Sequence, residues 1–190
     1  MVRAFRPDPV PAAILDRVLD AARRGPSAGF AQGVALVVLE GADQTSSYWD
    51  TVTTPAWRTA SSRWPGLSAA PVIVIPLANR QTYLDRYSEA DKAASGLDRA
   101  EAWPVPYWLV DAAFATMLLL LAAADEGLGA VFQGIWRGEE ELLSNLGVPE
   151  GWKPIGAVAL GWPDPRGDHP SPSLSRGRRP WEEVVHRARW

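Results

Sequence analysis

The sequence predicts a single domain, residues 1–190, that mixes helices and strands. Short continuous apolar runs, such as PVIVIPL at 71–77, are typical of buried strands, whereas longer segments with apolar residues three or four positions apart indicate helices. The length of 190 residues is usual for one domain or for one subunit of a compact oligomer. No repeat and no internal linker divides the sequence.

The first expected element is a helix at Asp8–Arg24. Asp8 is its candidate N-cap, and Pro9 or Pro11 lies in its first turn, where proline is tolerated. Apolar residues recur on one helical face from position 10 to position 22, which predicts that this face is buried. Gly25-Pro26 ends the helix, and a short loop leads to the next element.

Two strands are expected next, at Val34–Leu39 and Pro71–Leu77. Both are continuous apolar runs that suit buried strands. Pro76 is expected at the end of its strand or on a sheet edge, because proline has no N–H to donate to a neighbouring strand. Residues 41–68 between the strands are polar and dotted with tryptophan, and we expect a helix there around Tyr48–Trp57.

The C-terminal half centres on a long helix at Tyr107–Glu126, which Gly127 ends. This helix is apolar almost all round, which predicts a central position. The polar loop before it is expected to be mobile, either as a lid beside a cleft or without a function. The other expected elements are a helix at Gln81–Tyr87, that loop at Ser88–Pro106, a short strand or extended turn at Leu128–Gln133, a helix at Glu139–Leu146, a strand at Pro154–Leu160, turns at Gly161–Pro180 and a short closing element at Trp181–Val185.

Composition excludes several classes of function. The formal net charge of −3 gives no strong attraction to nucleic acid. The chain has no cysteine, so it has no disulfide, no thiolate nucleophile and no cysteine-bound metal. His169 and His186 do not follow the spacing of metal ligands, and no metal site is expected.

The sequence predicts no membrane partner. The longest apolar run, Ala112–Ala124, is bounded by Asp111 and Asp125 and is too short to cross a bilayer. Arg3 and Arg6 near the N-terminus are not followed by the apolar region of a signal peptide. We therefore expect a cytoplasmic protein.

One motif suggests a serine hydrolase. Gly25–Gly29 reads G-P-S-A-G and matches the nucleophile elbow G-x-S-x-G, with Ser27 as the nucleophile. The elbow needs a strand before the serine and a helix after it, whereas here a helix precedes Ser27 and a strand follows. The hydrolase stays an alternative with an inverted structural context.

Arginines gather near both ends of the chain. Arg3 lies at the start, and Arg176, Arg178 and Arg179 crowd the end. Arginines from distant segments can converge on one phosphate, which they bind through paired charged hydrogen bonds. The other interpretation, a solvated basic tail, is equally compatible with the sequence.

Several further segments share one order along the chain. They are Val2–Phe5, Pro26–Val34, Asp111–Gly129, Gly147–Pro149 with Ile155–Gly161, and Arg178–His186. In this order the chain resembles the nitroreductase family, the FMN-dependent NAD(P)H oxidoreductases. The matching family patterns are R-R-S-V-R-x-F, P-S-x-x-N-x-Q-P-W, D-x-x-x-A-x-x-x-L-L-x-A-x-x-x-G-L-G, G-(V/I)-P with I-G-x-x-x-L-G, and R-R-P-x-E-E-V-V-H.

The resemblance implies a mixed α+β fold with a mainly antiparallel central sheet flanked by helices. It also implies an obligate homodimer with two FMN sites at the interface. Hydride would pass from NAD(P)H to the flavin and then to a nitroaromatic, a quinone or a similar small acceptor. The flavin would carry this chemistry, so no catalytic side chain is expected.

The resemblance also implies the residues that hold the cofactor. Arg3 would reach the ribityl-phosphate end of FMN, the Pro26–Gly29 loop would lie along it, and Val131–Gly134 would pass the isoalloxazine ring. Arg178 or Arg179, with Arg176, would bind the phosphate. The complete expected set is Arg3, Pro26, Ser27, Ala28, Gly29, Gln32, Val131, Phe132, Gln133, Gly134, Arg176, Arg178 and Arg179.

Three aromatic residues are candidates for the substrate side of the site. Trp103, Tyr107 and Trp108 lie where the 88–106 loop meets the long helix. They can cover the flavin and select flat substrates, or they can cap the helix and pack at a dimer interface. Both interpretations stay open.

The sequence departs from the family pattern at the cofactor site. Met1 stands where the opening serine would be, and the paired arginines that precede it in the family would fall before Met1. Phe30 replaces the usual asparagine, and Gly33-Val34 replace Pro-Trp. Either the true start lies upstream of Met1, or this subunit binds FMN weakly. Weak binding favours an alternative function, a flavin-binding or flavin-sequestering protein without turnover.

Overall fold

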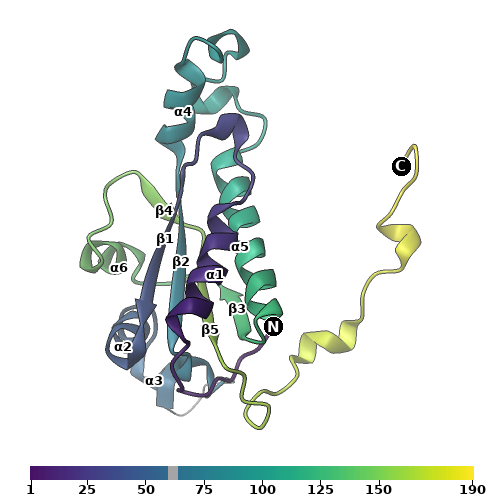
Figure 1. Ribbon diagram of the computed structural model, residues 1–190. Helices are drawn as coiled ribbons and strands as arrows, with labels where there is room; N and C mark the ends of the chain where they lie inside the picture. Colours follow the sequence, from purple (N-terminus) through teal and green to yellow (C-terminus); the bar gives the residue numbers. More distant parts are fainter. Residues whose placement is uncertain (60–63) are drawn as a thin grey trace.

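The computed structural model describes residues 1–59 and 64–190 (Figure 1). In these residues one sheet has the strand order β1-β2-β5-β3, and β4 pairs with β2 beside β5. All the pairings are antiparallel. The strands are β1 (Val34–Glu40), β2 (Val72–Asn79), β3 (Gly129–Gln133), β4 (Trp152–Pro154) and β5 (Ala157–Gly161).

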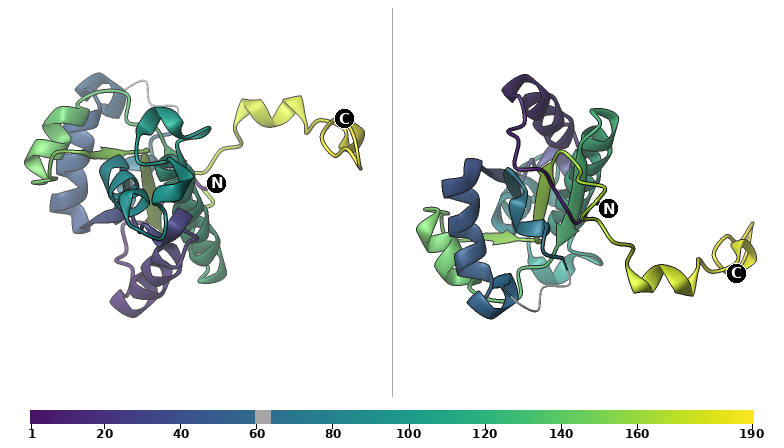
Figure 2. Two further views of the ribbon diagram at one scale, coloured as in Figure 1. Left: turned by 90° about the horizontal axis from the view of Figure 1, so that it is seen from above. Right: turned by 90° about the horizontal axis from the view of Figure 1, so that it is seen from below.

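Helices cover both faces of the sheet, as the views from above and from below show (Figure 2). Helices α1 (Ala12–Arg23) and α5 (Tyr107–Asp125) pack on one face, and α2 (Gly41–Val52) and α6 (Glu139–Asn145) pack on the other. This confirms the α+β fold with an antiparallel sheet flanked by helices. The remaining helical segments are α3 (Pro55–Thr59), α4 (Arg80–Ser88) and the 3-10 turns at Ala28–Phe30, Leu67–Ala69, Ala93–Ser95, Ala100–Ala102, Pro172–Arg176 and Trp181–Glu183.

Strand β2 divides the core into two layers. Val72 and Val74 face α1 and α5, whereas Ile73 and Ile75 face α2 and α6, as the alternation of a strand requires. Pro76 lies inside this central strand, so the expectation of an end or edge position is wrong. Its carbonyl accepts the Ile155 N–H, so its missing N–H faces the break between β4 and β5, where no ladder bond is lost.

Two expected helices differ from the helices in the structure. Helix α1 begins at Ala12 with Pro11 as N-cap, and Asp8 instead pairs with Arg6. Val10 precedes a proline, which disfavours helical geometry there and delays the start of the helix. The helix expected around Tyr48–Trp57 is two helices, α2 and α3, and residues 60–63 of that polar stretch lie outside the described residues.

The predicted strand at Pro154–Leu160 is also divided. Gly156 has φ +147, which bends the chain between β4 and β5. Strand β1 is half-buried rather than fully buried, because it pairs only with β2 and lies at the edge of the sheet. Its continuous apolar run therefore reflects a cleft beside it as well as the core.

Helix α5 has two apolar faces. One face, with Ala112, Ala115, Leu119 and Ala123, is buried in the core. The helix is long and apolar enough to cross a membrane by length and composition, a test that the core helix of a soluble protein also passes. Its second face is exposed and carries Leu109, Phe114, Met117 and Leu121.

The end of the chain runs away from the sheet and its helices. The tail, residues 169–190, extends into solvent in all three views (Figures 1 and 2). Residues before it are tied to the N-terminal segment, because the Asp164 N–H donates to the Ala4 carbonyl and Phe5 bridges Pro163. The extent of a single domain, residues 1–190, stays a prediction.

Candidate functional site

The N-terminal segment runs beside the edge strand β3. The Val2 N–H donates to the Ala130 carbonyl at 3.1 Å, and the Arg3 N–H donates to an Asp168 carboxylate oxygen at 3.0 Å. The Arg3 guanidinium lies 4.8 Å from the centroid of the Trp64 ring. The structure therefore places Arg3 next to β3, which contains Val131–Gln133 and is followed by Gly134.

A cavity of about 390 Å³ opens where β3 ends, and we call it the tryptophan cavity. Gln133 and Gly134 line it, and Gln133 donates from Nε2 to the Tyr48 hydroxyl at 3.3 Å. Its aromatic walls are Tyr48, Trp49, Trp57, Trp64 and Trp136. The predicted residues Arg3, Gln133 and Gly134 thus gather around one aromatic hollow.

The walls of the tryptophan cavity are flat aromatic rings, one of which has a buried indole N–H. Trp49 and Trp57 stack with ring centroids 5.6 Å apart and planes 15° apart. The buried Trp49 indole N–H has no hydrogen-bond partner within the described chain. Burial raises the pKa of Tyr48 to about 12, although the bond from Gln133 opposes this shift. The flat walls of the cavity can hold an aromatic ring, whereas the Trp49 N–H is enclosed by the protein.

The Pro26–Gly33 loop, which contains the predicted cofactor residues Pro26–Gly29 and Gln32, is held by its own hydrogen bonds and by two helices. The Ala28 N–H donates to Asp111 Oδ2 of α5 at 2.8 Å, and Arg86 Nε of α4 donates to the Gly29 carbonyl at 2.8 Å. Within the loop, the Gln32 N–H donates to Ser27 Oγ at 2.8 Å. The loop therefore has a fixed shape before any ligand binds.

Asp111 is the buried residue to which the Pro26–Gly33 loop is hydrogen-bonded. It is 3% exposed, and its Oδ2 also accepts the Tyr83 hydroxyl at 2.8 Å. Burial and then Asp111 raise the pKa of Tyr83, while a hydrogen bond from Ser27 opposes the shift. Tyr83 therefore remains a neutral donor that links Ser27 to Asp111.

This geometry argues against the hydrolase alternative. Ser27 follows helix α1 and precedes strand β1, the reverse of a nucleophile elbow. Its neighbours are Tyr83 and Asp111, and the two imidazoles, His169 and His186, lie on the projecting tail. A serine without an adjacent base remains a weak nucleophile.

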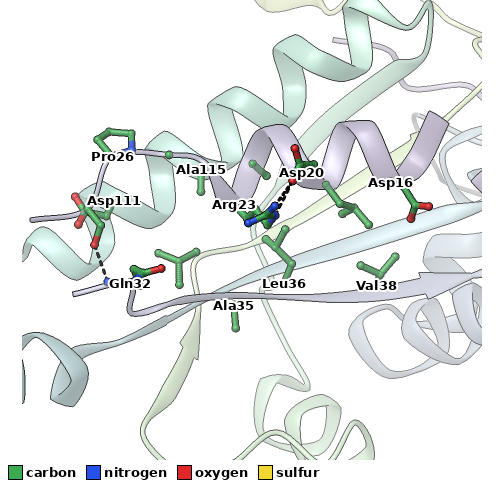
Figure 3. Close-up of a pocket in the computed structure, with 15 residues that line it drawn as sticks. Asp16, Asp20, Arg23, Pro26, Gln32, Ala35, Leu36, Val38, Asp111 and Ala115 are labelled. Carbon is green, nitrogen blue, oxygen red and sulfur yellow. Dashed lines mark hydrogen bonds and ion pairs between the residues drawn. The ribbon is translucent and has the colours of Figure 1, made fainter. Parts of the chain in front are cut away.

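A second cleft, of about 630 Å³, lies between α1 and β1 and ends at the Pro26–Gly33 loop (Figure 3). Leu36 and Val38 form its apolar floor, and Asp16, Asp20 and Arg23 line its α1 side. Arg23 pairs with Asp20 at 2.6 Å, so these charges are partly satisfied within the helix. The cleft lies on the far side of the sheet from the tryptophan cavity.

The predicted substrate residues form one aromatic cluster near the same loop. Trp103 packs against Tyr87, Tyr107 and Trp108 with ring centroids 4.7, 5.7 and 6.1 Å apart. Trp103 is buried and donates from Nε1 to the Leu97 carbonyl, so it anchors the 88–106 loop, whereas Tyr107 is exposed. The structure brings the three residues together but gives Trp103 a packing role.

One chain does not bring the whole predicted set together. The Pro26–Gly33 loop is bound at Asp111, near the start of α5, whereas Arg3 lies beyond the end of this helix at Asp125. The 14 helical steps from 111 to 125 separate these places by about 20 Å. Arg176, Arg178 and Arg179 lie on the tail, away from both places.

Sequence reasoning missed several residues of the site. Tyr83 and Arg86 escaped because their partners are distant in sequence and no motif contains them. Trp49 and Trp64 escaped because the 41–68 stretch has no clear period, although its unusual tryptophan content was a signal. Among the described residues, no cluster of histidine, aspartate and glutamate could hold a metal ion.

The fold and site define a class of protein, an α+β domain with two aromatic surfaces. One is the tryptophan cavity at the end of β3, and the other is the Trp103 cluster near the Pro26–Gly33 loop. The model of the "Nitroreductase family" matches residues 1–162, and the chain belongs to this family of oxidoreductases. A protein of Thermus thermophilus named NADH dehydrogenase is 30% identical over 203 residues, covering 97% of this chain and 89% of its own.

Solved structures share the fold at lower identity. The structure of B. megaterium NfrA1 is similar with a TM-score of 0.73 and 18% identity, over 100% of this chain and 70% of that one. A nitroreductase-like protein from Streptococcus mutans is similar with a TM-score of 0.66 and 18% identity, over 95% of this chain and 93% of that one. At such identities the likeness shows the fold alone.

Proposed function

We propose that this protein is an FMN-dependent oxidoreductase that transfers hydride from NADH or NADPH through the flavin to a nitroaromatic, a quinone or a similar small acceptor. We propose further that it works as a soluble, cytoplasmic homodimer. The observation that carries this proposal is the placement of two complementary half-sites at opposite ends of α5, with an exposed apolar face between them.

A two-fold pairing of α5 would complete both sites. Leu109, Phe114, Met117 and Leu121 are between 41% and 59% exposed and lie along one side of the helix. Exposed apolar surface of this kind marks a protein interface, and a two-fold axis pairs the same patch from both copies. In an antiparallel pair, the Pro26–Gly33 loop of one copy lies at the Arg3 end of the other, which gives two equal sites.

The donors at the Arg3 end support FMN as the cofactor. The flat aromatic walls of the tryptophan cavity suit a heteroaromatic ring. The Ala130 carbonyl faces the outer edge of β3, where it accepts the Val2 N–H. Alternate residues of an antiparallel strand face the same edge, so the Phe132 N–H also points outward and can donate to the ring.

Arginines of the tail would complete the phosphate end. Arg3 provides one charge there, and its guanidinium is oriented by the Trp64 ring. The tail that contains Arg176, Arg178 and Arg179 projects away from the sheet and helices of its own chain. We propose that it packs on the second copy and brings these arginines to the phosphate. FMN, when bound, supplies the atom that accepts and returns hydride.

A flavin-binding protein without turnover is the second candidate. The observation that favours it is the exposed Phe30 at the position where the family pattern has asparagine. Loss of one buried polar contact can weaken cofactor binding by roughly tenfold to a hundredfold. Such a protein would hold flavin without exchanging electrons with NAD(P)H.

The absorption spectrum of the purified protein tests the proposal. FMN is added and the protein is desalted, and NADH or NADPH is then added without oxygen. Retained flavin that is bleached supports the oxidoreductase, whereas retained flavin that is not bleached supports the second candidate. A protein that retains no flavin, even when made with additional upstream residues, contradicts both.

A further inference from the structure

Phe30 is held in a conformation that phenylalanine rarely adopts. Its φ is +56, and Gln32, two residues later, also has φ +56. The left-handed region is unfavourable for a residue with a large side chain, because the Cβ approaches its own backbone. Such conformations persist where the surrounding structure imposes them, and they are found most often at functional sites.

The surroundings of Phe30 impose this conformation through backbone contacts alone. The Phe30 N–H donates to the Ser27 carbonyl at 2.8 Å, Arg86 donates to the preceding Gly29 carbonyl, and the following Ala31 N–H donates to the Ala28 carbonyl at 3.1 Å. A Cβ on Gly29 would lie 2.6 Å from the Tyr87 ring, so the loop also packs closely on α4. None of these contacts uses the phenyl ring, which is 73% exposed.

The exposed ring lies at the same end of the molecule as an aromatic cluster. The loop is bound at Asp111, one turn along α5 from the exposed Tyr107, and Tyr107 belongs to the cluster of Trp103 and Trp108. Phe30 and Tyr107 therefore lie at the same end of α5. Both rings are exposed, and an exposed ring suits stacking on another flat ring.

We propose that Phe30 is a specificity-determining residue that stacks on the aromatic ring of the electron acceptor. This inference rests on the proposed function, because the acceptor reaches the ring in the site shared by two copies. The hydrogen bonds of the loop fix the backbone at Phe30, so no backbone ordering is needed when the acceptor binds. A planar quinone or nitroaromatic is then favoured over acceptors that have no ring.

The test compares two acceptors in one set of variants. Reduction of menadione to its hydroquinone consumes the hydride of one NAD(P)H and one proton, whereas ferricyanide takes single electrons, so two are reduced for each NAD(P)H oxidised. Phe30→Asn removes the ring and suits a positive φ. The kcat/KM for menadione, divided by that for ferricyanide, is expected to fall about tenfold, the usual contribution of an aromatic pair. Phe30→Tyr keeps the ring and is expected to keep the ratio.

Two further measurements separate stacking from other roles. The melting temperature of the apoprotein is expected to stay or rise in Phe30→Asn, because strain is relieved, and the dimer mass is expected to be unchanged. A lower melting temperature or loss of the dimer would assign the ring to folding or to the interface and overturn the proposal. An unchanged acceptor ratio would overturn it as well. A wild-type protein that reduces neither acceptor would refute the proposed function, and the role of Phe30 with it.

Discussion

Asp111→Ala removes the acceptor on which the Pro26–Gly33 loop depends. Its Oδ2 accepts the Ala28 N–H and the Tyr83 hydroxyl, each at 2.8 Å, from a site that is 3% exposed. A hydrogen bond to a charged group contributes about 1.5–3 kcal/mol, so the loss of two is expected to lower the free energy of unfolding by about 3–6 kcal/mol. This is a large share of the stability of a typical domain.

Urea unfolding followed by tryptophan fluorescence measures this change. Tyr83→Phe removes only one of the two bonds and is expected to cost about 1.5–3 kcal/mol, which keeps a folded variant available. Its effect should shrink in the Asp111→Ala background, because the two residues share one interaction. Asp16→Ala, which removes an exposed carboxylate of α1, is the control and should change stability by less than about 0.5 kcal/mol. If Asp111→Ala is as mild as this control, the carboxylate does not hold the loop.

The remaining predictions concern the interface, the aromatic cavity and alkaline pH. Met117→Asp on the exposed face of α5 is expected to give a monomer by light scattering and to release FMN, whereas Ser144→Asp on the exposed side of α6 should do neither. Trp49→Phe shortens the stacked ring pair that walls the tryptophan cavity, so FMN is expected to bind about tenfold more weakly by fluorescence titration; unchanged binding would exclude Trp49 from the site. The pKa of Tyr48 is raised from 10.0 to about 12, so its contribution to stability is complete below pH 10 and is lost as pH rises toward 12. The loss from Tyr48 is about 3 kcal/mol, so Tyr48→Phe should reduce the slope of the melting temperature across that range, with Tyr83 accounting for part of what remains, while an unchanged slope would contradict a buried phenol.

Local patterns were enough to predict most of the fold. The period of the apolar residues located α1 and α5, and the short apolar runs located β1, β2 and β3, because burial alone determines these patterns. The errors fell where a non-local contact decides the local structure. Pro76 occupies a central strand only because β4 and β5 leave a break opposite it, and no feature of its own segment reveals that break.

The candidate site was predictable by motif but not by geometry. The motifs pointed to the Pro26–Gly29 loop and to Val131–Gly134, yet they gave no sign of Tyr83 or Arg86, which support the loop from a helix distant in sequence. The strain at Phe30 was equally hidden, since a backbone torsion is imposed by the surroundings of a residue and not by its identity. Sequence identified the residue types, and the structure identified which of them are fixed.

The length of helix α5 explains why one chain cannot bring all the predicted cofactor residues together. Its 19 residues, at 1.5 Å each, extend over about 28 Å, and this length separates the loop bound at Asp111 from the Arg3 end. A motif specifies which residues serve one ligand, but it cannot specify that they come from two copies of the chain. The apolar face that α5 leaves exposed supplies this information, because a two-fold pairing of that face is what brings each loop to the other copy's Arg3. Cofactor binding and dimer formation should therefore be lost together, and a stable monomer that holds FMN with wild-type affinity would refute a shared site.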